Sequence, residues 1–344
     1  MSLASLLLGQ FPAGLNLMNG DTVSNLNFAA YDQYVQDQQK LFDTFCSLAI
    51  APDMLATLGM VAHQIRHKTQ CDEVLSYISA SAGNGDRASF QATLNLVARL
   101  VSMVEIGSVE TEFAFQHHAS QRPLLQWTEG NLASLLGRIF SSSPQIDCSG
   151  MVAPLALDAW SLDKVAGIKV RFTNNLADHL RLANKDTLLY VFHHVAFLEH
   201  QKYSTVLPEG LAEETLKTLA ILFPQSDYCG SLRSTRKKRV WLGRLRAHSI
   251  YTIDDRLTWC GTPNMDDRQP ARFRFWRDRL VIIKEVYDES TPDSFSEWWH
   301  DRRNGVQWHN FWVAIVVLGL TALFGLIQCV LAAIQVHKAY HPSN

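Results

Sequence analysis

The sequence has no paired-cysteine motif and no acceptor for N-linked glycans. Its six cysteines are spread over 344 residues without a single CxxC pair, so they do not read as a disulfide framework. No Asn-x-Ser/Thr triplet occurs either, and nothing therefore suggests a domain shaped for a glycosylating lumen. Both absences favour a reducing compartment.

Signals for nucleotide binding and for secretion are also missing. Neither GxxxxGK[ST] nor GxGxxG occurs in the chain, which disfavours nucleotide hydrolysis of the usual kind. The apolar run Leu3–Leu8 is short and has no basic residue before it, so we do not expect a cleaved signal peptide. The formal net charge is -2, which gives no overall reason to expect a nucleic-acid partner. We predict no cofactor and no metal.

The most informative segment is a long uncharged run near the C-terminus, Phe311–Ile334. Its 24 residues would form a helix about 36 Å long at about 1.5 Å per residue, enough to cross a hydrocarbon core of roughly 30 Å. Arg302 and Arg303 precede the run and only Lys338 follows it. This basic bias predicts that the N-terminal side lies in the cytosol. The position of the run predicts insertion after translation, as in tail-anchored proteins, into the endoplasmic reticulum or another endomembrane.

This span has one face of small and polar residues. The residues of this face follow one another at steps of three and four positions. Such a face permits close packing and side-chain hydrogen bonding between helices in lipid. It predicts self-association or packing against a partner helix, although small residues are common in membrane helices anyway. The residues predicted to form this packing seam are Ala314, Thr321, Gly325, Gln328 and Ala332.

The whole chain has 47% hydrophobic and 19% charged residues, and the part outside the span is long enough to bury a substantial core. We predict a predominantly α fold with a smaller mixed α+β part and one C-terminal transmembrane helix. The predicted regions are a helical region (1–150), a mixed region with a basic stretch (151–292), a juxtamembrane linker (293–310), the transmembrane helix (311–334) and a short tail (335–344).

Apolar spacing predicts the main helices and strands of this part. Asp86 is expected to cap its helix and Gly107 to end it. Predicted helices are 27–50, one starting near Pro52, 87–106, 131–140, 195–201, 208–223 and 277–287. Predicted strands are 168–172 and 188–192, with 240–242 and 249–253 as weaker candidates.

Several groups of polar residues could be interpreted as metal or catalytic sites, and each also has a simpler structural interpretation. His63 and His67 stand four residues apart, as helical zinc ligands do, but Gln64 occupies the place of the metalloprotease glutamate. An exposed polar face explains the pair better. The adjacent pairs His117/His118 and His193/His194 would point about 100° apart on a helix, so they do not predict a metal site either.

A further polar cluster, Asn174, Asn175, Asp178 and His179, follows the strand predicted at 168–172. A catalytic interpretation has Asp178 orienting His179, but adjacent residues rarely pair in this way and no nucleophile is identifiable. A helix cap formed by Thr173 or Asn174 is the simpler interpretation.

The strongest charge feature is a basic stretch interrupted by Trp241. Seven basic residues fall within Arg233–Arg246. Close to a membrane anchor, such a surface can contact anionic lipid headgroups, while a solvated face or a nuclear-import-like motif remain the alternatives. The predicted membrane-surface residues are Arg236, Lys237, Lys238, Arg239, Arg302 and Arg303.

Several motifs resemble those of one group of proteins. They are WRDRLVIIKE from Trp276, WWHDRRNGVQW from Trp298, FWVA from Phe311, GLIQC from Gly325, AYHP from Ala339, and, further upstream, FTNNLADHLRL from Phe172 and YVFHHVAFL from Tyr190. These segments look like the C-terminal half of a group of uncharacterised fungal membrane-anchored proteins with a single C-terminal transmembrane helix. The resemblance implies a fungal origin and brings no activity with it.

Three functions are compatible with these features. The leading prediction is a membrane-tethered interaction or regulatory protein that binds an unidentified protein partner, without enzymatic activity. The first alternative is a membrane-anchored enzyme or accessory factor of fungal specialised metabolism. The second is a subunit of an oligomeric CorA-like ion channel, from which the chain departs because it has one span and no Gly-Met-Asn motif.

Overall fold

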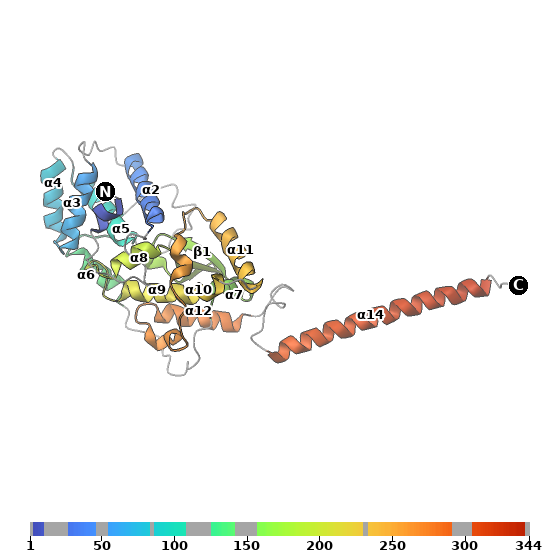
Figure 1. Cartoon of the computed structure of the whole chain (residues 1–344). Coiled ribbons are helices and arrows are strands. Elements are labelled where there is room, and N and C mark those ends of the chain that lie inside the picture. Colours follow the sequence, from blue (N-terminus) through green and yellow to red (C-terminus); the bar gives the residue numbers. More distant parts are fainter. Residues whose placement is uncertain are drawn as a thin grey trace. The chain divides into compact units, whose positions relative to one another are not determined.

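The computed structural model describes residues 3–9, 27–45, 54–82, 86–107, 125–141, 157–229, 233–290 and 305–340. The chain divides into two compact units (Figure 1): unit 1 is Met1–Asp163 with Ile168–Glu289, and unit 2 is Lys164–Gly167 with Ser290–Asn344. Unit 1 consists of helices around one small mixed sheet, and unit 2 contains one long helix. The predicted fold class is confirmed.

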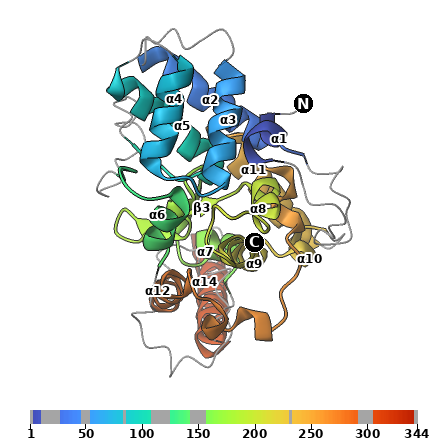
Figure 2. The ribbon, with the colours of Figure 1, turned by 90° about the vertical axis from the view of Figure 1, so that its left-hand side faces the viewer.

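The N-terminal helices gather around α5. They are α1 (Leu3–Leu8), α2 (Ala29–Phe45), α3 (Met54–Arg66), α4 (Cys71–Ala82) and α5 (Arg87–Ser102), which lie together in Figure 2. All residues of α5 from Leu96 to Ser102 are buried, because α2, α3 and α4 pack on this helix. Helices α2 and α3 were both predicted, whereas α1 and α4 were not. Residues 46–53, including Pro52, lie outside the described part.

Helix α5 begins as predicted and ends earlier. The Asp86 side chain caps it by accepting the backbone N–H of Ser89 at 3.0 Å. The helix ends at Ser102 rather than at Ile106, because Met103 takes a left-handed conformation with φ 52°. Gly107 also has positive φ, and a Cβ there would lie 2.3 Å from the side-chain nitrogen of Asn95, so this turn requires glycine.

The next helix, α6 (Leu132–Ile139), is capped by Asn131, whose side-chain oxygen accepts the N–H of Ser134 at 2.8 Å. This confirms the helix predicted at 131–140. A short helix, α7 (Ala159–Lys164), then leads into the sheet.

The sheet has three strands in the order β1-β3-β2. Strand β1 (Lys169–Thr173) runs parallel to β3 (Leu188–Phe192), and β2 (Arg181–Ala183) pairs with β3 antiparallel. A 3₁₀ turn, η4 (Leu176–Asp178), lies between β1 and β2. Strands β1 and β3 confirm the predictions at 168–172 and 188–192, and β2 was not predicted.

The helices after the sheet complete unit 1. They are α8 (Val195–Gln201), α9 (Leu211–Leu222), α10 (Gln225–Tyr228), α11 (Arg233–Ala247), η5 (Asp255–Trp259), η6 (Asp266–Arg268), η7 (Pro270–Arg272) and α12 (Arg277–Glu289). The strands proposed at 240–242 and 249–253 are wrong. The first lies inside α11, where good helix formers on both sides outweigh a short apolar run, and the second has no strand pairing.

Contacts far apart in sequence connect the N-terminal helices with α8. The Tyr31 ring stacks on Phe197 with centroids 5.7 Å apart, and the Tyr31 hydroxyl donates to the Leu100 carbonyl at 2.8 Å. His200 Nε2 donates to the Gly9 carbonyl at 3.1 Å. The hydrophobic core therefore spans both predicted regions, while their predicted boundary at residue 150 lies outside the described residues.

Unit 2 contains helix α14 (Gly305–Tyr340). The predicted span, 311–334, lies entirely within it, and the helix continues into parts of the segments expected as linker and tail. Residues 291–304 lie outside the described part, so Arg302 and Arg303 cannot be placed.

Candidate functional site

Helix α14 contains a segment suited to cross a membrane. From His309 to His337 it is 29 residues long, with a mean hydropathy of 2.5 and no burial against other parts of the chain. Its apolar side chains are exposed to a degree unusual for such residues: Leu318 is 71% and Leu326 is 65% exposed. In water this surface would be costly, at about 25 cal/mol per Å² of apolar area, whereas lipid would cover it.

The predicted packing seam lies along one side of α14. At 3.6 residues per turn, Ala314, Thr321, Gly325, Gln328 and Ala332 fall within one narrow stripe of the helix. Every one of them is exposed. The Thr321 hydroxyl donates to the Val317 carbonyl within the helix at 2.8 Å. The geometry fits the predicted seam, and helix association remains a prediction.

Helix α11 carries the predicted basic surface. Arg236, Lys237 and Arg239 are exposed, whereas Lys238 points inward and is only 16% exposed. Its ammonium contacts Asp227 Oδ2 at 2.6 Å and Asp158 Oδ1 at 3.3 Å. Lys238 therefore belongs to the packing of α11 and not to its outer surface, a difference that the sequence did not reveal.

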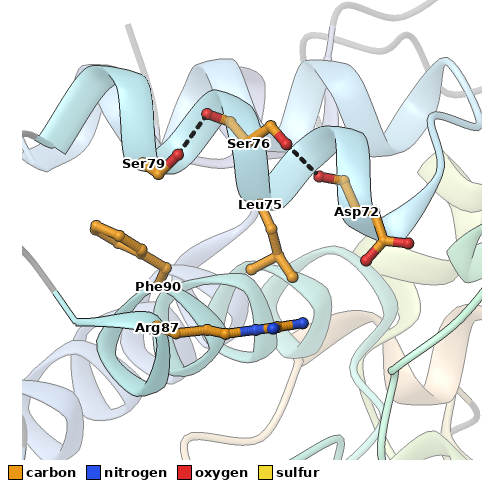
Figure 3. Close-up of a pocket in the computed structure, with 6 residues that line it drawn as sticks. All are labelled: Asp72, Leu75, Ser76, Ser79, Arg87 and Phe90. Atoms are coloured by element: carbon orange, nitrogen blue, oxygen red, sulfur yellow. Dashed lines mark hydrogen bonds between the residues drawn. The ribbon is translucent and has the colours of Figure 1, made fainter.

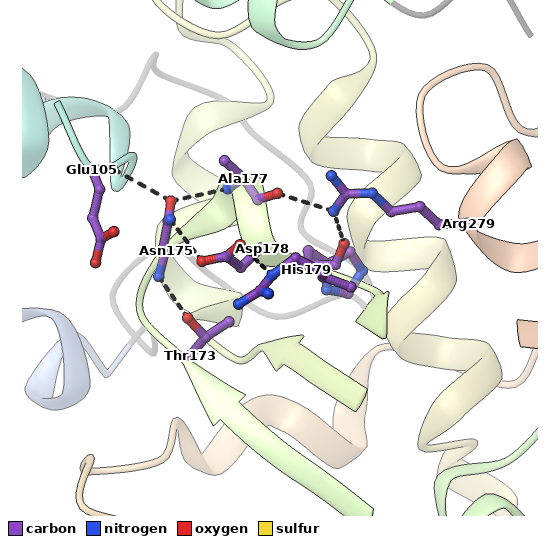
Figure 4. A network of polar contacts seen from close by, with 8 residues as sticks. Glu105, Thr173, Asn175, Ala177, Asp178, His179 and Arg279 are labelled. Atoms are coloured by element: carbon purple, nitrogen blue, oxygen red, sulfur yellow. Dashed lines mark hydrogen bonds and ion pairs between the residues drawn. The ribbon is translucent and has the colours of Figure 1, made fainter. Parts of the chain in front are cut away.

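The polar cluster after β1 forms a closed network (Figure 4). Asn175, rather than the predicted Thr173 or Asn174, caps η4: its Oδ1 accepts the Ala177 N–H at 3.1 Å, and its Nδ2 donates to Asp178 at 2.9 Å. The other oxygen of Asp178 binds Arg181 Nε at 2.7 Å. Asp178 thus holds the turn and strand β2 together, and does not orient His179.

His179 is also bonded to its own surroundings. Its Nδ1 accepts the backbone N–H of Phe192 at 3.2 Å, and its Nε2 lies 2.7 Å from the Thr218 hydroxyl. This arrangement requires the neutral tautomer with hydrogen on Nε2, and burial lowers the pKa of the ring well below its usual value. Arg279 of α12 donates to the carbonyls of Ala177 and His179. The ring therefore connects β3 with α9 and is not free for proton transfer.

His193 and His194 form a second buried histidine site. They lie just before α8, so the 100° separation expected on a helix does not apply, and their rings stack 4.0 Å apart. Both Nε2 atoms face Asn174 Oδ1, at 3.1 and 2.7 Å. Both Nδ1 atoms are buried without a hydrogen-bond partner among the described residues. Burial lowers the pKa of His193 to about 3 and also depresses that of His194.

The histidine pairs do not form a metal centre in the described part of the chain. No group of three or more His, Cys, Asp or Glu side chains there is arranged to hold an ion. His63 on α3 and His67, the residue after that helix, are exposed with their Nε2 atoms 3.1 Å apart, and no third ligand accompanies them among the described residues. His117 and His118 lie outside the described residues.

A pocket of about 350 Å³ opens between α4 and α5 (Figure 3). Its serine hydroxyls are bonded within α4: Ser76 donates to the Asp72 carbonyl and Ser79 to the Ser76 carbonyl, both at 2.8 Å. No histidine lies beside these hydroxyls to activate them. The pocket is lined by Asp72, Leu75, Ser76, Ser79, Arg87 and Phe90.

Two buried carboxylates have structural roles that the sequence did not indicate. Glu214 on α9 accepts three backbone N–H groups just before α12, from Arg274, Phe275 and Trp276. Asp254 accepts the Ala196 N–H in the first turn of α8 at 2.8 Å. Both carboxylates bind helix N-termini from more than fifty residues away in sequence, and no local motif encodes such contacts.

Comparison with protein-family models, with curated proteins and with solved structures found no match for this chain.

Proposed function

We propose that this protein is a membrane-anchored binding protein, in which α14 crosses the bilayer and unit 1 binds a protein partner at the membrane surface. The observation that carries the anchor is the apolar segment His309–His337, in which no residue is buried. A soluble core helix of this hydropathy would be covered by its own protein.

Binding, rather than catalysis, agrees best with the state of the polar groups in unit 1. Asp178 and His179 are buried and bonded to neighbouring turns and strands, and the pocket between α4 and α5 lacks an activated nucleophile. Groups arranged in this way stabilise a domain and do not transfer protons to a substrate.

We further propose that unit 1 faces the cytosol. Arg302 and Arg303 before the span outnumber Lys338 after it, as the positive-inside rule requires. Cys71, Cys229 and Cys260 are free thiols, and the exposed Cys229 suits a reducing compartment.

Alkaline carbonate extraction of membranes from cells that make the full-length protein tests the anchor. We expect the protein to stay in the pellet until detergent is added. Leu320→Lys with Leu323→Lys should release it, since each central charge costs about 2.5–3.5 kcal/mol of insertion free energy. The matched control, Leu320→Ile with Leu323→Ile, should remain in the pellet. Release of the unaltered protein by carbonate would refute the anchor.

The orientation has a separate test. In sealed vesicles with the cytosolic face outward, a membrane-impermeant maleimide should label Cys229, and Cys229→Ser should remove that label. Labelling that appears only after the vesicles are opened would place unit 1 on the other side.

A further inference from the structure

Helix α11 is fixed in one orientation by the contacts of its inner face. Thr235 and Leu242 are buried, and the Trp241 indole donates to Asp163 Oδ2 at 2.8 Å. On the same side, Lys238 is held by Asp158 and Asp227. The opposite face of the helix is therefore permanently turned to the outside of unit 1.

Four cations lie on this outer face: Arg236, Lys237, Arg239 and Arg244 are exposed. None of the four has an ion-pair partner among the described residues, and α11 contains no acidic residue. Like charges three or four positions apart destabilise an isolated helix. The face thus carries uncompensated positive charge that an anionic partner would neutralise.

An apolar residue occupies the middle of the charged face. Val240 is 48% exposed and lies between Arg236 and Arg244 on the helix surface, one turn from each. Lipid interfaces accept such a combination, because the cations meet phosphates while an apolar side chain enters the boundary with the acyl chains. Nucleic-acid phosphates would satisfy the cations and leave Val240 in water.

The covalent connection to α14 limits how far this face can lie from a bilayer. Helix α12 ends at Glu289 and α14 begins at Gly305, and the intervening residues reach at most roughly 50 Å when fully extended. Tethering at this range gives the headgroups a high effective concentration near α11. Contacts that are individually weak then suffice to hold this face against the bilayer.

We propose that the outer face of α11 binds anionic glycerophospholipid headgroups of the membrane in which α14 is anchored. This inference rests on the proposed anchor. The contact would hold unit 1 against the bilayer and fix which of its other surfaces face a protein partner.

The test uses the full-length protein reconstituted into vesicles of phosphatidylcholine alone or with about 30% phosphatidylserine, a lipid that gives an anionic surface. Floated vesicles are treated with a water-soluble amine reagent, and the labelling rate of each lysine is read by mass spectrometry. Lys237 should react several-fold more slowly in the anionic vesicles. Lys185 and Lys217, which are exposed on other parts of unit 1, should react equally in both.

Charge variants make the test specific. Arg236→Gln with Arg239→Gln should weaken the contact about 25-fold, from about fivefold per cation, and abolish the protection of Lys237. The matched control, Arg171→Gln with Arg272→Gln, removes two exposed cations elsewhere and should leave the protection of Lys237 intact. About 0.5 M salt should abolish this protection in the unaltered protein, because salt screens the attraction between the cations and the headgroups.

The outcomes separate the two proposals. Protein that floats with both vesicles but shows equal labelling of Lys237 overturns the headgroup contact and leaves the anchor standing. Protein that floats with neither overturns both. If an oligonucleotide protects Lys237 in neutral vesicles and phosphatidylserine does not, the face recognises nucleic acid and the lipid proposal is wrong.

Discussion

The backbone N–H of Trp276 donates a 2.7 Å hydrogen bond to Glu214 Oε1. The same carboxylate accepts the N–H groups of Phe275, at 2.7 Å, and Arg274, at 2.8 Å, while the Trp276 indole donates to the hydroxyl of the neighbouring Thr215 at 2.9 Å. These N–H groups lie at the N-terminal end of α12, where no intrahelical acceptor exists. The Glu214 carboxylate therefore attaches α12 to α9.

Replacing this carboxylate should weaken the attachment. In Glu214→Gln an amide NH₂ group must face at least one of the three backbone donors, so we expect a loss of about 1–3 kcal/mol in the free energy of unfolding. Denaturant unfolding of the full-length protein in detergent, followed by tryptophan fluorescence, measures it. Glu213→Gln, at an exposed position of the same helix, is the control and should change little; equal losses in both variants would contradict the role of Glu214.

The cap of α6 gives a second prediction. Asn131→Ala removes the acceptor of the Ser134 N–H and should cost about 1 kcal/mol, whereas Asn131→Ser keeps a capping oxygen and should retain most of the stability. The same unfolding experiment compares them. An alanine variant as stable as the serine variant would mean that the cap contributes nothing.

The orientation of α11 can be checked by replacing two neighbouring lysines, Lys238 and Lys237, in separate variants. Lys238→Met breaks the contacts with Asp227 and Asp158 and leaves two carboxylates close together, so we expect a loss of about 1 kcal/mol or more. Lys237→Met, at the adjacent exposed position, should be within about 0.5 kcal/mol of the unaltered protein. The reverse order of stabilities would show that the helix is rotated.

Acid should destabilise unit 1. Burial lowers the pKa of His193 to about 3, and burial also depresses the pKa values of His179, His194 and His200. These rings are neutral when folded and become charged when unfolded below about pH 6.5, so the stability present above that pH is lost as the pH falls toward 3. Asp254 acts in the opposite sense, because burial raises its pKa to about 6.

Four histidines oppose two carboxyl groups, Asp254 and Glu214, whose pKa values are raised by burial, so the net effect between pH 7 and pH 5 is a loss of stability. Each strongly shifted histidine contributes up to about 1.4 kcal/mol per pH unit below its unfolded pKa. The midpoint of denaturant unfolding, measured at pH 7, 6 and 5, should fall steadily. A midpoint that rises toward pH 5 would mean that the two carboxyl groups dominate.

The seam of α14 yields a prediction about association in the membrane. Gly325→Leu with Gln328→Leu should reduce the signal of a membrane dimerisation reporter carrying this helix, because both changes obstruct close approach and Gln328→Leu also removes a hydrogen-bonding group. Val316→Leu with Val330→Leu, away from the seam, should leave the signal unchanged. If both pairs behave alike, the seam is not an interface.

Sequence patterns predicted those elements whose apolar spacing is strong. The bounds of α8 and β3 agree with prediction, and those of α6 and β1 differ from prediction by about one residue at each end. Helix α4 was not predicted because the second half of its sequence is mostly serine and alanine, and Ser76 and Ser79 bond to the helix's own backbone. Strand β2 is only three residues long and half-buried throughout, so it lacks the alternation that identifies a strand.

The side-chain network was less predictable than the fold. Asn174, Asn175, Asp178 and His179 were recognised as a cluster, but the partners of Asn174 and His179 were not, because those partners lie on other elements. The contact of His194 with Asn174 spans 20 residues, and that of His179 with Thr218 spans 39. Such pairings depend on how strands and helices pack, which residue spacing does not determine.

The contacts that join the N-terminal helices to α8 also set an order of events during synthesis. Tyr31 and Gly9 meet Phe197 and His200 only after the ribosome has released about two hundred residues. Until then the residues of the first helices that contact α8, such as Tyr31, lack their native partner and are available to chaperones. Nascent chains stalled before α8 should therefore be retained by holdases and degraded, whereas chains that extend past α12 should resist proteases.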